Sequence, residues 1–450
     1  MKMTMTSIAY KLPIALFVLC GFASAWAQTP KPEDFSAQAA AVTEFDVNGL
    51  KVIVKRRPSA PTVAGGLFVR GGARNIDEKN AGIENLMLAS ATDAGQKMPR
   101  SVVRRELSRL GSSIGSATAN DYSVISLAST RGNFDRVWEI FTEVTLNPAF
   151  TPADIDVNRE RILAGLREAG TSPESALQSI QSHIIFAGHP YANDVNGTTA
   201  NIARFTPAEL RAYHKSVMQT SRLLLVFVGD LDPEQLKTRI AATFGKLPRG
   251  EYKESPLPAL DFSKGTLNVS ARTLPTNYIQ GSFAAPALRD PDYYAMRVAT
   301  SILATLVNQE VRVKRQLSYA PSADMESNAA NSANISVSAT DANQAVSVML
   351  DQIKLLQTRT LNEGVIDEIA AFFLTRYYLG QETSAAQVGE LARYELIGGG
   401  WRNSFNFLRG VRSVSPDDVR TAANKYMKNI RFAVVGSEQS LDKSVFLPVE

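Results

Sequence analysis

The feature that most constrains the fold of this chain is an internal repeat with a period of roughly 210 residues. Residues 205–210 (FTPAEL) and 414–419 (VSPDDV) each place Thr or Ser before Pro and an acidic residue after it, which is typical of a helix start. An apolar strand ending in Val-Gly follows each of them, at 223–229 and 432–436. The helix starts lie 209 residues apart and the closing glycines lie 207 residues apart. Solenoid repeats have periods of about 20–50 residues, so this spacing predicts a duplicated domain instead.

The seam between the two copies falls just after Gly250. Residues 250–260 (GEYKESPLPAL) are polar and contain proline, as linkers are. We therefore expect a first domain at 36–250, a linker at 251–260 and a second domain at 261–447. The length of the chain suits this division, since single domains have about 100–200 residues.

Residues 1–27 have the pattern of a secretory signal peptide. Two lysines are the only charges there, residues 12–23 are apolar, and Ala-Trp-Ala at 25–27 supplies the small residues that precede a cleavage site. The apolar run is too short for a membrane-spanning helix, which needs about 20 apolar residues. Cys20 is the only cysteine and would leave with the signal peptide. The mature chain is therefore predicted to be exported, soluble and free of disulfides.

Within each half, strand patterns and helix patterns follow one another without strict alternation. Residues 45–56 have a strand pattern on each side of Asn-Gly at 48–49, and Asn-Gly is a turn signal that predicts a β-hairpin. A further strand is predicted at 61–70, and a second hairpin at 114–130. Helices are predicted at 81–94, 101–110, 134–146, 152–168, 173–186 and 207–218. This order favours the α+β class, with one mainly antiparallel sheet in each half and helices on one face of it.

Charge and motifs argue against several classes of function. The formal net charge is only +4 over 450 residues and no block of Lys or Arg stands out, so a nucleic-acid-binding protein is not expected. Residues 398–400 (GGG) lack the pattern of a phosphate-binding loop and predict a helix end followed by a turn.

Five short segments together resemble one enzyme family. They are 69–75 (VRGGARN), 81–89 (AGIENLMLA), 117–119 (ATA), 228–231 (VGDL) and 244–248 (FGKLP). In this order and spacing they are similar to segments of the pitrilysin/insulinase-type zinc peptidases, the family of the mitochondrial processing peptidases. The resemblance covers essentially the whole mature chain. It implies two homologous domains, each a mainly antiparallel sheet covered by helices, that form half of a clamshell.

The metal-binding motif of that family is missing here. Active members carry His-x-x-Glu-His on an early helix, where positions i, i+3 and i+4 share one face, so that the imidazoles bind Zn²⁺ and the Glu activates water. The matching positions in this chain are Asn85, Leu88 and Ala89. The third ligand is a Glu that follows seven residues after the Glu of a Glu-Arg pair; residues 160–161 match the pair, and Arg167 takes the ligand position. The resemblance therefore implies that this chain holds no metal or other cofactor and is inactive alone.

The three histidines do not suggest a replacement metal site. His183 and His189 are six residues apart, which is not a spacing that shares a helix face, and His214 stands apart from both. We expect all three histidines at the surface or in loops.

A second feature of the family is retained in the C-terminal half. Residues 308–319 (NQEVRVKRQLSY) resemble the segment in which active members hold an Arg and a Tyr seven residues apart, and Arg312 and Tyr319 take those positions. From composition alone, Arg312 would be a solvated helix residue and Tyr319 a half-buried strand residue. The resemblance instead implies that both reach a zinc site across the chamber. There a phenol would stabilise the oxygen that becomes negative in peptide hydrolysis, and a guanidinium would hold a carbonyl or carboxylate.

These observations lead to the hypothesis that two chains together form one active site. The chain resembles the non-catalytic subunit of a bacterial periplasmic heterodimer, in which a homologous partner would supply His-x-x-Glu-His and the zinc. Unfolded peptides would be the substrate, paired with an exposed sheet edge. Two alternatives stay open. One is a scaffold or peptide-binding subunit like the inactive family members of respiratory complexes, and the other is a homodimeric pseudopeptidase that releases peptides intact.

Overall fold

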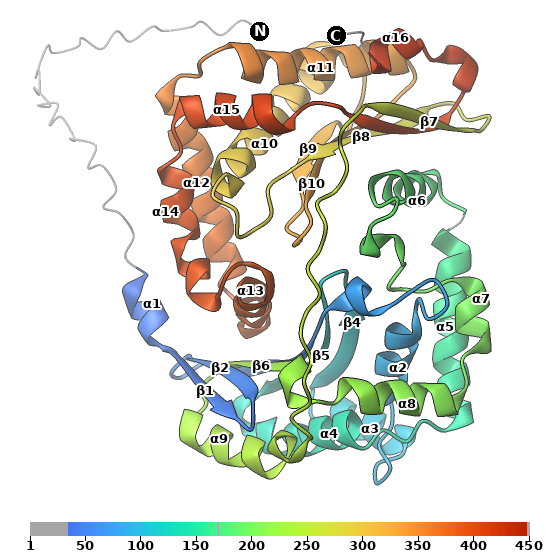
Figure 1. The fold of residues 1–450 in the computed structure, drawn as a ribbon. Helices are drawn as coiled ribbons and strands as arrows, with labels where there is room; N and C mark the ends of the chain where they lie inside the picture. Colours follow the sequence, from blue (N-terminus) through green and yellow to red (C-terminus); the bar gives the residue numbers. More distant parts are fainter. Residues whose placement is uncertain (1–34, 170, 448–450) are drawn as a thin grey trace, which may run out of the picture. The chain divides into compact units, whose positions relative to one another are not determined.

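The structure is a computed structural model that describes residues 35–169 and 171–447. These residues form two halves, each built from one sheet and a set of helices (Figure 1). The predicted α+β class with two similar halves is confirmed. The predicted signal peptide, residues 1–27 with Cys20, lies outside the described residues.

The first half contains a six-stranded sheet with the strand order β1-β2-β6-β3-β5-β4. Its strands are β1 (Val42–Val47), β2 (Leu50–Arg56), β3 (Thr62–Arg70), β4 (Ser113–Thr118), β5 (Tyr122–Thr130) and β6 (Leu223–Gly229). Neighbouring strands are antiparallel except β2 and β6, which are parallel. Every residue of β6 is buried, because a continuous apolar run suits a strand that is covered on both faces. The edges of the sheet are β1 and β4.

The second half repeats this plan with a five-stranded sheet in the order β7-β11-β8-β10-β9. Its strands are β7 (Thr266–Ala271), β8 (Asn277–Ala284), β9 (Ser322–Met325), β10 (Ser332–Ala339) and β11 (Arg431–Gly436). Only the pair β7 and β11 is parallel in this sheet. Strand β11 therefore takes the place that β6 has in the first sheet, as the internal repeat predicts.

Helices fill the intervals between strands. The first half contains α1 (Ser36–Ala40), α2 (Ile83–Ala91), α3 (Arg100–Arg109), α4 (Phe134–Leu146), α5 (Pro152–Ala169), α6 (Pro173–Ile185), α7 (Thr199–Arg204), α8 (Pro207–Val217) and α9 (Pro233–Ala242). The second half contains α10 (Tyr293–Val307), α11 (Ala342–Thr358), α12 (Glu363–Gly380), α13 (Ser384–Ile397), α14 (Phe407–Arg412), α15 (Pro416–Tyr426) and α16 (Lys443–Phe446). Over the part of the chain that the structure describes, no helix combines the length and apolarity needed to cross a membrane.

The repeated helix starts are confirmed in atomic detail. Thr206 accepts a hydrogen bond from the backbone N–H of Glu209 at 3.2 Å, and the Glu209 carboxylate accepts one from the backbone N–H of Thr206 at 2.7 Å. Ser415 and Asp418 form the same reciprocal pair at the start of α15, at 3.2 and 2.9 Å. Each capping box satisfies backbone donors that the first helical turn leaves without partners.

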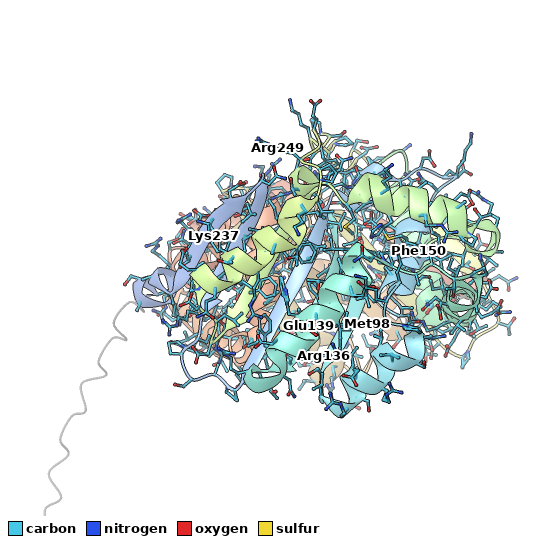
Figure 2. The ribbon with its side chains drawn as sticks, turned by 90° about the horizontal axis from the view of Figure 1, so that it is seen from below. Met98, Arg136, Glu139, Phe150, Lys237 and Arg249 are labelled. Atoms are coloured by element: carbon cyan, nitrogen blue, oxygen red, sulfur yellow. The ribbon has the colours of Figure 1, made fainter. Side chains whose placement is uncertain are left out.

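A layer of helices covers one face of the first sheet. Trp138 of α4 lies with its ring 5.8 Å from Phe227 of β6 and 5.9 Å from Phe244, measured between ring centroids. Figure 2 shows this layer from outside, where Arg136 and Glu139 on the opposite side of α4 form an ion pair at 2.7 Å. The helix is thus apolar toward the sheet and charged toward solvent.

The other face of each sheet is covered by a helix exchanged between the halves. Helix α13 of the second half packs on β3 and β6, and helix α6 of the first half packs on β8 and β11 (Figure 1). Leu391 of α13 belongs to the same buried cluster as Phe68 and Val226, and Leu177 of α6 belongs to one with Ala433 and Val435. The prediction of helices on one face only is therefore wrong, because each half covers the second face of the other's sheet.

Hydrogen bonds fix both exchanged helices at their sheets. Ser384, at the start of α13, donates to the Thr62 carbonyl at 3.2 Å and accepts from Arg57 at 3.0 Å. At the second sheet, the Gln181 side chain of α6 donates to the Arg431 carbonyl of β11 at 3.1 Å. The two halves are joined by polar contacts as well as by apolar packing.

A tight turn after β3 depends on two glycines. Gly71 has φ +106° and Gly72 has φ +47°, values that L side chains rarely adopt. A Cβ atom on Gly72 would lie 2.4 Å from the carbonyl oxygens of Ala119 and Asn120. This close approach lets the Ala73 N–H donate to the Asn120 carbonyl at 2.9 Å. The Gly-Gly pair is thus required where the turn meets the β4–β5 hairpin.

Replacing Gly72 by alanine should lower the free energy of unfolding by about 2–5 kcal/mol, because left-handed backbone strain costs about 1–2 kcal/mol and overpacking about 1–3 kcal/mol. Gly111 provides the matched control, since it has φ +56° but nothing lies within 4 Å of an added Cβ. Gly111→Ala should lose only the strain energy, about 1–2 kcal/mol. Urea unfolding of both variants measures the difference, and an equal loss would contradict the steric account.

Candidate functional site

Helix α2 presents the three residues that replace the metal motif of the resembled family. Asn85 is half-buried, and its side-chain N–H donates to the Asn196 carbonyl at 3.2 Å. Leu88 is buried in the core of the first half, and Ala89 is buried as well. The alkyl side chains of these two residues carry no lone pair, so they can neither bind a metal nor accept a proton from water.

Arg167, at the third ligand position, is a cation that cannot bind a metal ion. It lies on α5 with its side chain 65% exposed. The guanidinium contacts its own helix, where Nε donates to the Leu163 carbonyl at 3.2 Å and an ion pair with Glu160 measures 3.7 Å. Among the residues that the structure describes, no group of three or more His, Cys, Asp or Glu side chains is placed to hold a metal ion. The side chains at these four positions do not fit zinc.

The buried carboxylate of Glu84, beside Asn85, was not among the residues predicted from the sequence. Glu84 accepts hydrogen bonds from the hydroxyls of Ser123 and Tyr213, the latter at 2.8 Å, and forms an ion pair with Arg222 at 3.4 Å. Burial and the adjacent carboxylate raise the pKa of the Tyr213 phenol, so it stays a neutral donor. The signal for this cluster was Glu84 itself, the one charged residue of α2. The cluster fixes α2 to β5, α8 and the segment before β6.

Arg312 and Tyr319 are brought together at the surface of the second half. The Arg312 guanidinium carbon lies 4.3 Å from the centroid of the Tyr319 ring, which is cation–π contact. Tyr319 is 80% exposed, although large hydrophobic side chains are normally covered. The contact arises because a π-helical segment, Asn308–Lys314, extends α10, and Gln316 then turns the chain with φ +55°. Such π-helical segments are frequent at functional sites.

The other cations of this segment are already paired. Lys314 forms an ion pair with Glu310 at 2.6 Å, and Arg315 pairs with the same carboxylate. These hydrogen bonds hold the pKa of Glu310 below its usual value. Within the described part of the chain, Arg312 forms no ion pair, so its five N–H donors remain available to a ligand. Tyr319 holds the guanidinium in place from one side.

Two of the three histidines, His189 and His214, make structural contacts, and the burial of these two differs from the prediction. His183 is exposed, and His189 lies in a loop, as expected, but it is buried. Its Nδ1 accepts from the Tyr191 N–H at 3.1 Å, so Nε2 carries the proton and donates to the Pro258 carbonyl at 3.2 Å. His214 contradicts the prediction, because it lies half-buried on helix α8 and contacts the Thr145 carbonyl at 2.8 Å. Burial lowers the pKa of both His189 and His214.

A second buried charge cluster joins the two halves. Asp121, between β4 and β5, pairs with Arg74 at 3.3 Å and accepts from the Ala329 N–H of the second half at 3.0 Å. The Tyr191 hydroxyl donates to the same carboxylate. Arg74 also pairs with Glu254 of the predicted linker at 3.1 Å. Arg74 of the VRGGARN segment therefore ties the turn between β4 and β5 to the connecting segment, and Asp121 joins this cluster to the second half. Spacing along the sequence did not reveal these contacts.

The arrangement can therefore bind and orient, but it carries no complete set of catalytic groups. An exposed guanidinium with free donors can hold a carboxylate or carbonyl, and the phenol beside it can donate one hydrogen bond. Neither group activates water at neutral pH without a base or a metal nearby.

Comparison with known proteins gives the family. Residues 51–199 match the insulinase family, peptidase family M16, and residues 204–371 match the peptidase M16 inactive domain. The chain is 24% identical over 265 residues to bovine cytochrome b-c1 complex subunit 1, a match that covers 58% of this chain and 55% of that protein. The chain thus spans about half the length of this curated relative.

Two further comparisons cover most of the chain. An uncharacterized zinc protease of Mycobacterium tuberculosis is 24% identical over 425 residues, covering 88% of this chain and 94% of the relative. The crystal structure of a peptidase M16 inactive domain from Pseudomonas fluorescens has a TM-score of 0.80 at 19% identity, covering 88% of this chain and 98% of that one. This likeness shows the same fold. The matches of residues 51–199 and 204–371 to this family show that the chain belongs to the insulinase family, peptidase family M16.

Proposed function

We propose that this chain is the non-catalytic subunit of a two-chain zinc peptidase and that it supplies Arg312 and Tyr319 to the active site of its partner. The observation that carries the proposal is the exposed, stacked pair, in which a free guanidinium fork and a phenol face solvent side by side. The partner's zinc would supply an activated water. From this chain, the phenol would donate a hydrogen bond to the oxygen that becomes negative, and the guanidinium would hold a substrate carbonyl or carboxylate.

Several observations support this role. The residues of α2 do not fit zinc, so a metal would have to come from another chain. Residues 204–371 match the inactive domain of the family, and the bovine relative is by name a subunit of a larger complex. Strands β4 and β9 are sheet edges, whose main-chain groups suit an extended, unfolded peptide. The signal-peptide pattern at residues 1–27 suits a periplasmic location.

The test is reconstitution with a homologous subunit that carries His-x-x-Glu-His and is encoded in the same genome. Cleavage of a fluorogenic peptide is measured for this chain alone, for the partner alone and for the mixture, with and without a chelator. We expect cleavage only in the mixture and its loss on chelation. Zinc-dependent cleavage by this chain alone would overturn the proposal.

A scaffold role is the second candidate, and the match to a subunit of the cytochrome b-c1 complex favours it. It predicts no gain of cleavage on mixing. The homodimeric alternative predicts that the chain alone binds a peptide and returns it intact, which mass spectrometry of the recovered peptide would show. The reconstitution experiment and the recovery of intact peptide together separate the three roles.

A further inference from the structure

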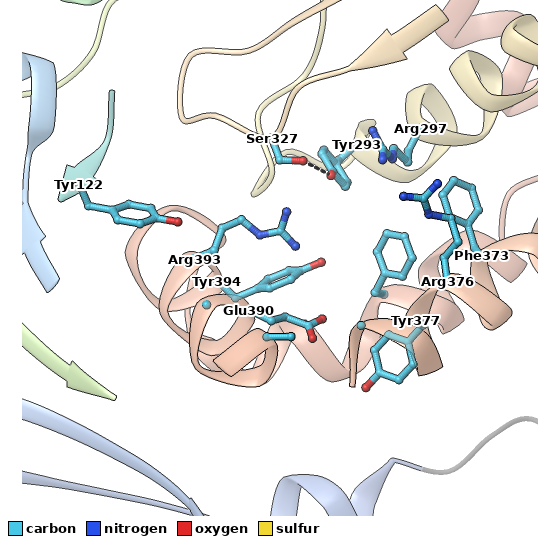
Figure 3. A pocket seen from close by; sticks show the side chains of 14 residues that line it. Tyr122, Tyr293, Arg297, Ser327, Phe373, Arg376, Tyr377, Glu390, Arg393 and Tyr394 are labelled. Atoms are coloured by element: carbon cyan, nitrogen blue, oxygen red, sulfur yellow. Dashed lines mark hydrogen bonds between the residues drawn. The ribbon is translucent and has the colours of Figure 1, made fainter. Parts of the chain in front are cut away.

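The second half contains a pocket that the proposed function does not use. Its volume is about 490 Å³, within the range of about 300–1,000 Å³ that is typical of small-ligand sites. Helices α10, α12, α13 and α14 provide most of the lining, and Tyr122 of β5 closes it from the first half. Figure 3 shows the side chains that surround this space.

Three arginines make the pocket cationic. Arg297, Arg376 and Arg393 come from α10, α12 and α13, and none of them takes part in an ion pair within the described residues. Arg297 donates to the Met325 carbonyl at 2.6 Å, which holds it against the wall. Arg376 and Arg393 make cation–π contacts to aromatic rings of their own helices, at 5.6 and 5.5 Å. In Figure 3 the guanidinium group of Arg393 points toward the space between Tyr293 and Tyr394.

One carboxylate limits the positive charge. Glu390 lines the pocket and accepts a hydrogen bond from Gln381. Burial raises the pKa of Glu390, against the opposing effect of the nearby Arg393. Three cations thus face at most one anion, so the pocket keeps a net positive charge and favours an anionic ligand.

The remaining walls are aromatic. Tyr293, Phe373, Tyr394 and Phe407 line the pocket, and the Tyr293 hydroxyl lies 2.9 Å from the Ser327 hydroxyl. Burial raises the pKa of the Tyr394 phenol, so its hydroxyl is neutral and can donate. A ligand must therefore combine an anion with an apolar or aromatic body.

We infer that this pocket binds the C-terminal residue of a peptide, with its free carboxylate on the Arg393 guanidinium, in the positive field of Arg376, and its side chain among the aromatic rings. The guanidinium fork matches a carboxylate in bidentate geometry, and aromatic faces accept an apolar side chain. The inference deepens the proposed function, because a subunit that holds peptide ends would orient substrates in a shared chamber. The binding itself needs neither the partner nor zinc, so it can hold or fail independently of the two-chain proposal.

The test compares two fluorescein-labelled peptides, four alanines followed by phenylalanine, that end in a free carboxylate or in an amide. Fluorescence anisotropy with the mature chain alone should give a Kd about 10- to 100-fold lower for the free acid, since charge-assisted hydrogen bonds are lost in the amide. Arg376→Gln and Arg393→Gln should each reduce this preference, and the double variant should bind both peptides alike. Arg376 is exposed, so its variant should fold normally.

Arg105→Gln is the matched control, because Arg105 is exposed on α3 in the other half of the chain. Its preference for the free acid should equal that of the unmodified chain. Equal affinity of the unmodified chain for acid and amide would overturn the inference. A preference that survives in the double variant would also overturn it, since the carboxylate would then be held elsewhere. Arg393→Lys should retain part of the preference, because the charge remains while the bidentate fork is lost.

Discussion

Replacing Tyr319 by phenylalanine should lower kcat of the reconstituted two-chain peptidase about 100- to 1000-fold, which corresponds to about 2.7–4 kcal/mol for the loss of one donor to a developing oxyanion. KM should change little, because the lost hydrogen bond forms in the transition state rather than with the bound substrate. The substitution should leave folding intact, since the side chain is 80% exposed and phenylalanine retains the ring on which Arg312 stacks. Steady-state kinetics with a fluorogenic peptide provide the measurement.

Val313 supplies the control for this experiment. It lies in the same π-helical segment and is 55% exposed, but it carries no hydrogen-bonding group. Val313→Ala should keep kcat within about twofold of the unmodified complex, as expected for exposed positions that make no specific contact. A Tyr319→Phe complex that is equally active would show that the phenol hydroxyl takes no part in catalysis.

Replacing Asp121 by alanine should lower the free energy of unfolding by about 3–5 kcal/mol, because it removes the more deeply buried of the two anions that pair with the Arg74 guanidinium. The side chains of Asp121 and Arg74 are only 3% and 9% exposed. The variant also removes the acceptor of the Ala329 N–H and of the Tyr191 hydroxyl, and with them the joint between the halves. Urea unfolding, followed by circular dichroism, measures the loss.

Asp135 is the matched control for this second experiment. It pairs with Arg239 at 2.7 Å, but its side chain is 69% exposed. Solvent-exposed ion pairs contribute about 0–1 kcal/mol, so Asp135→Ala should unfold within about 1 kcal/mol of the unmodified chain. Similar losses in the two variants would mean that burial of the Asp121 cluster has no energetic importance.

Local structure was predictable where one residue pattern determines one conformation. Asn48 and Gly49 have φ values of +55° and +83°, as a tight hairpin turn demands, and the sequence Asn-Gly predicts such a turn. The helix starts at Thr206 and Ser415 followed from the hydroxyl before each Pro and the acidic residues after it, and the structure shows a capping box at each. Helix 81–94 was predicted too long, because Gly82 at φ +88° delays the start of α2 to Ile83.

Contacts between segments far apart in the sequence could not be predicted from the sequence patterns. Arg222 and Glu84 are 138 residues apart, and nothing in their spacing indicates an ion pair. The stacking of Arg312 on Tyr319 also depends on long-range packing, because buried Val311 anchors the π-helical segment in the core of the second half. A regular helix or strand with seven-residue spacing would not have given this geometry. The resemblance named these two residues, and the fold brings them into contact.

The exchange of α6 and α13 has a consequence for the order of events during synthesis. The first sheet is complete when β6 leaves the ribosome, but the residues of α13 that cover its second face follow about 160 residues later. At about 5–20 residues per second, that interval lasts on the order of ten to thirty seconds. During this time the apolar side chains of Phe68 and Val226 lack their cover. The nascent chain would therefore be a client for a chaperone until its last quarter has emerged.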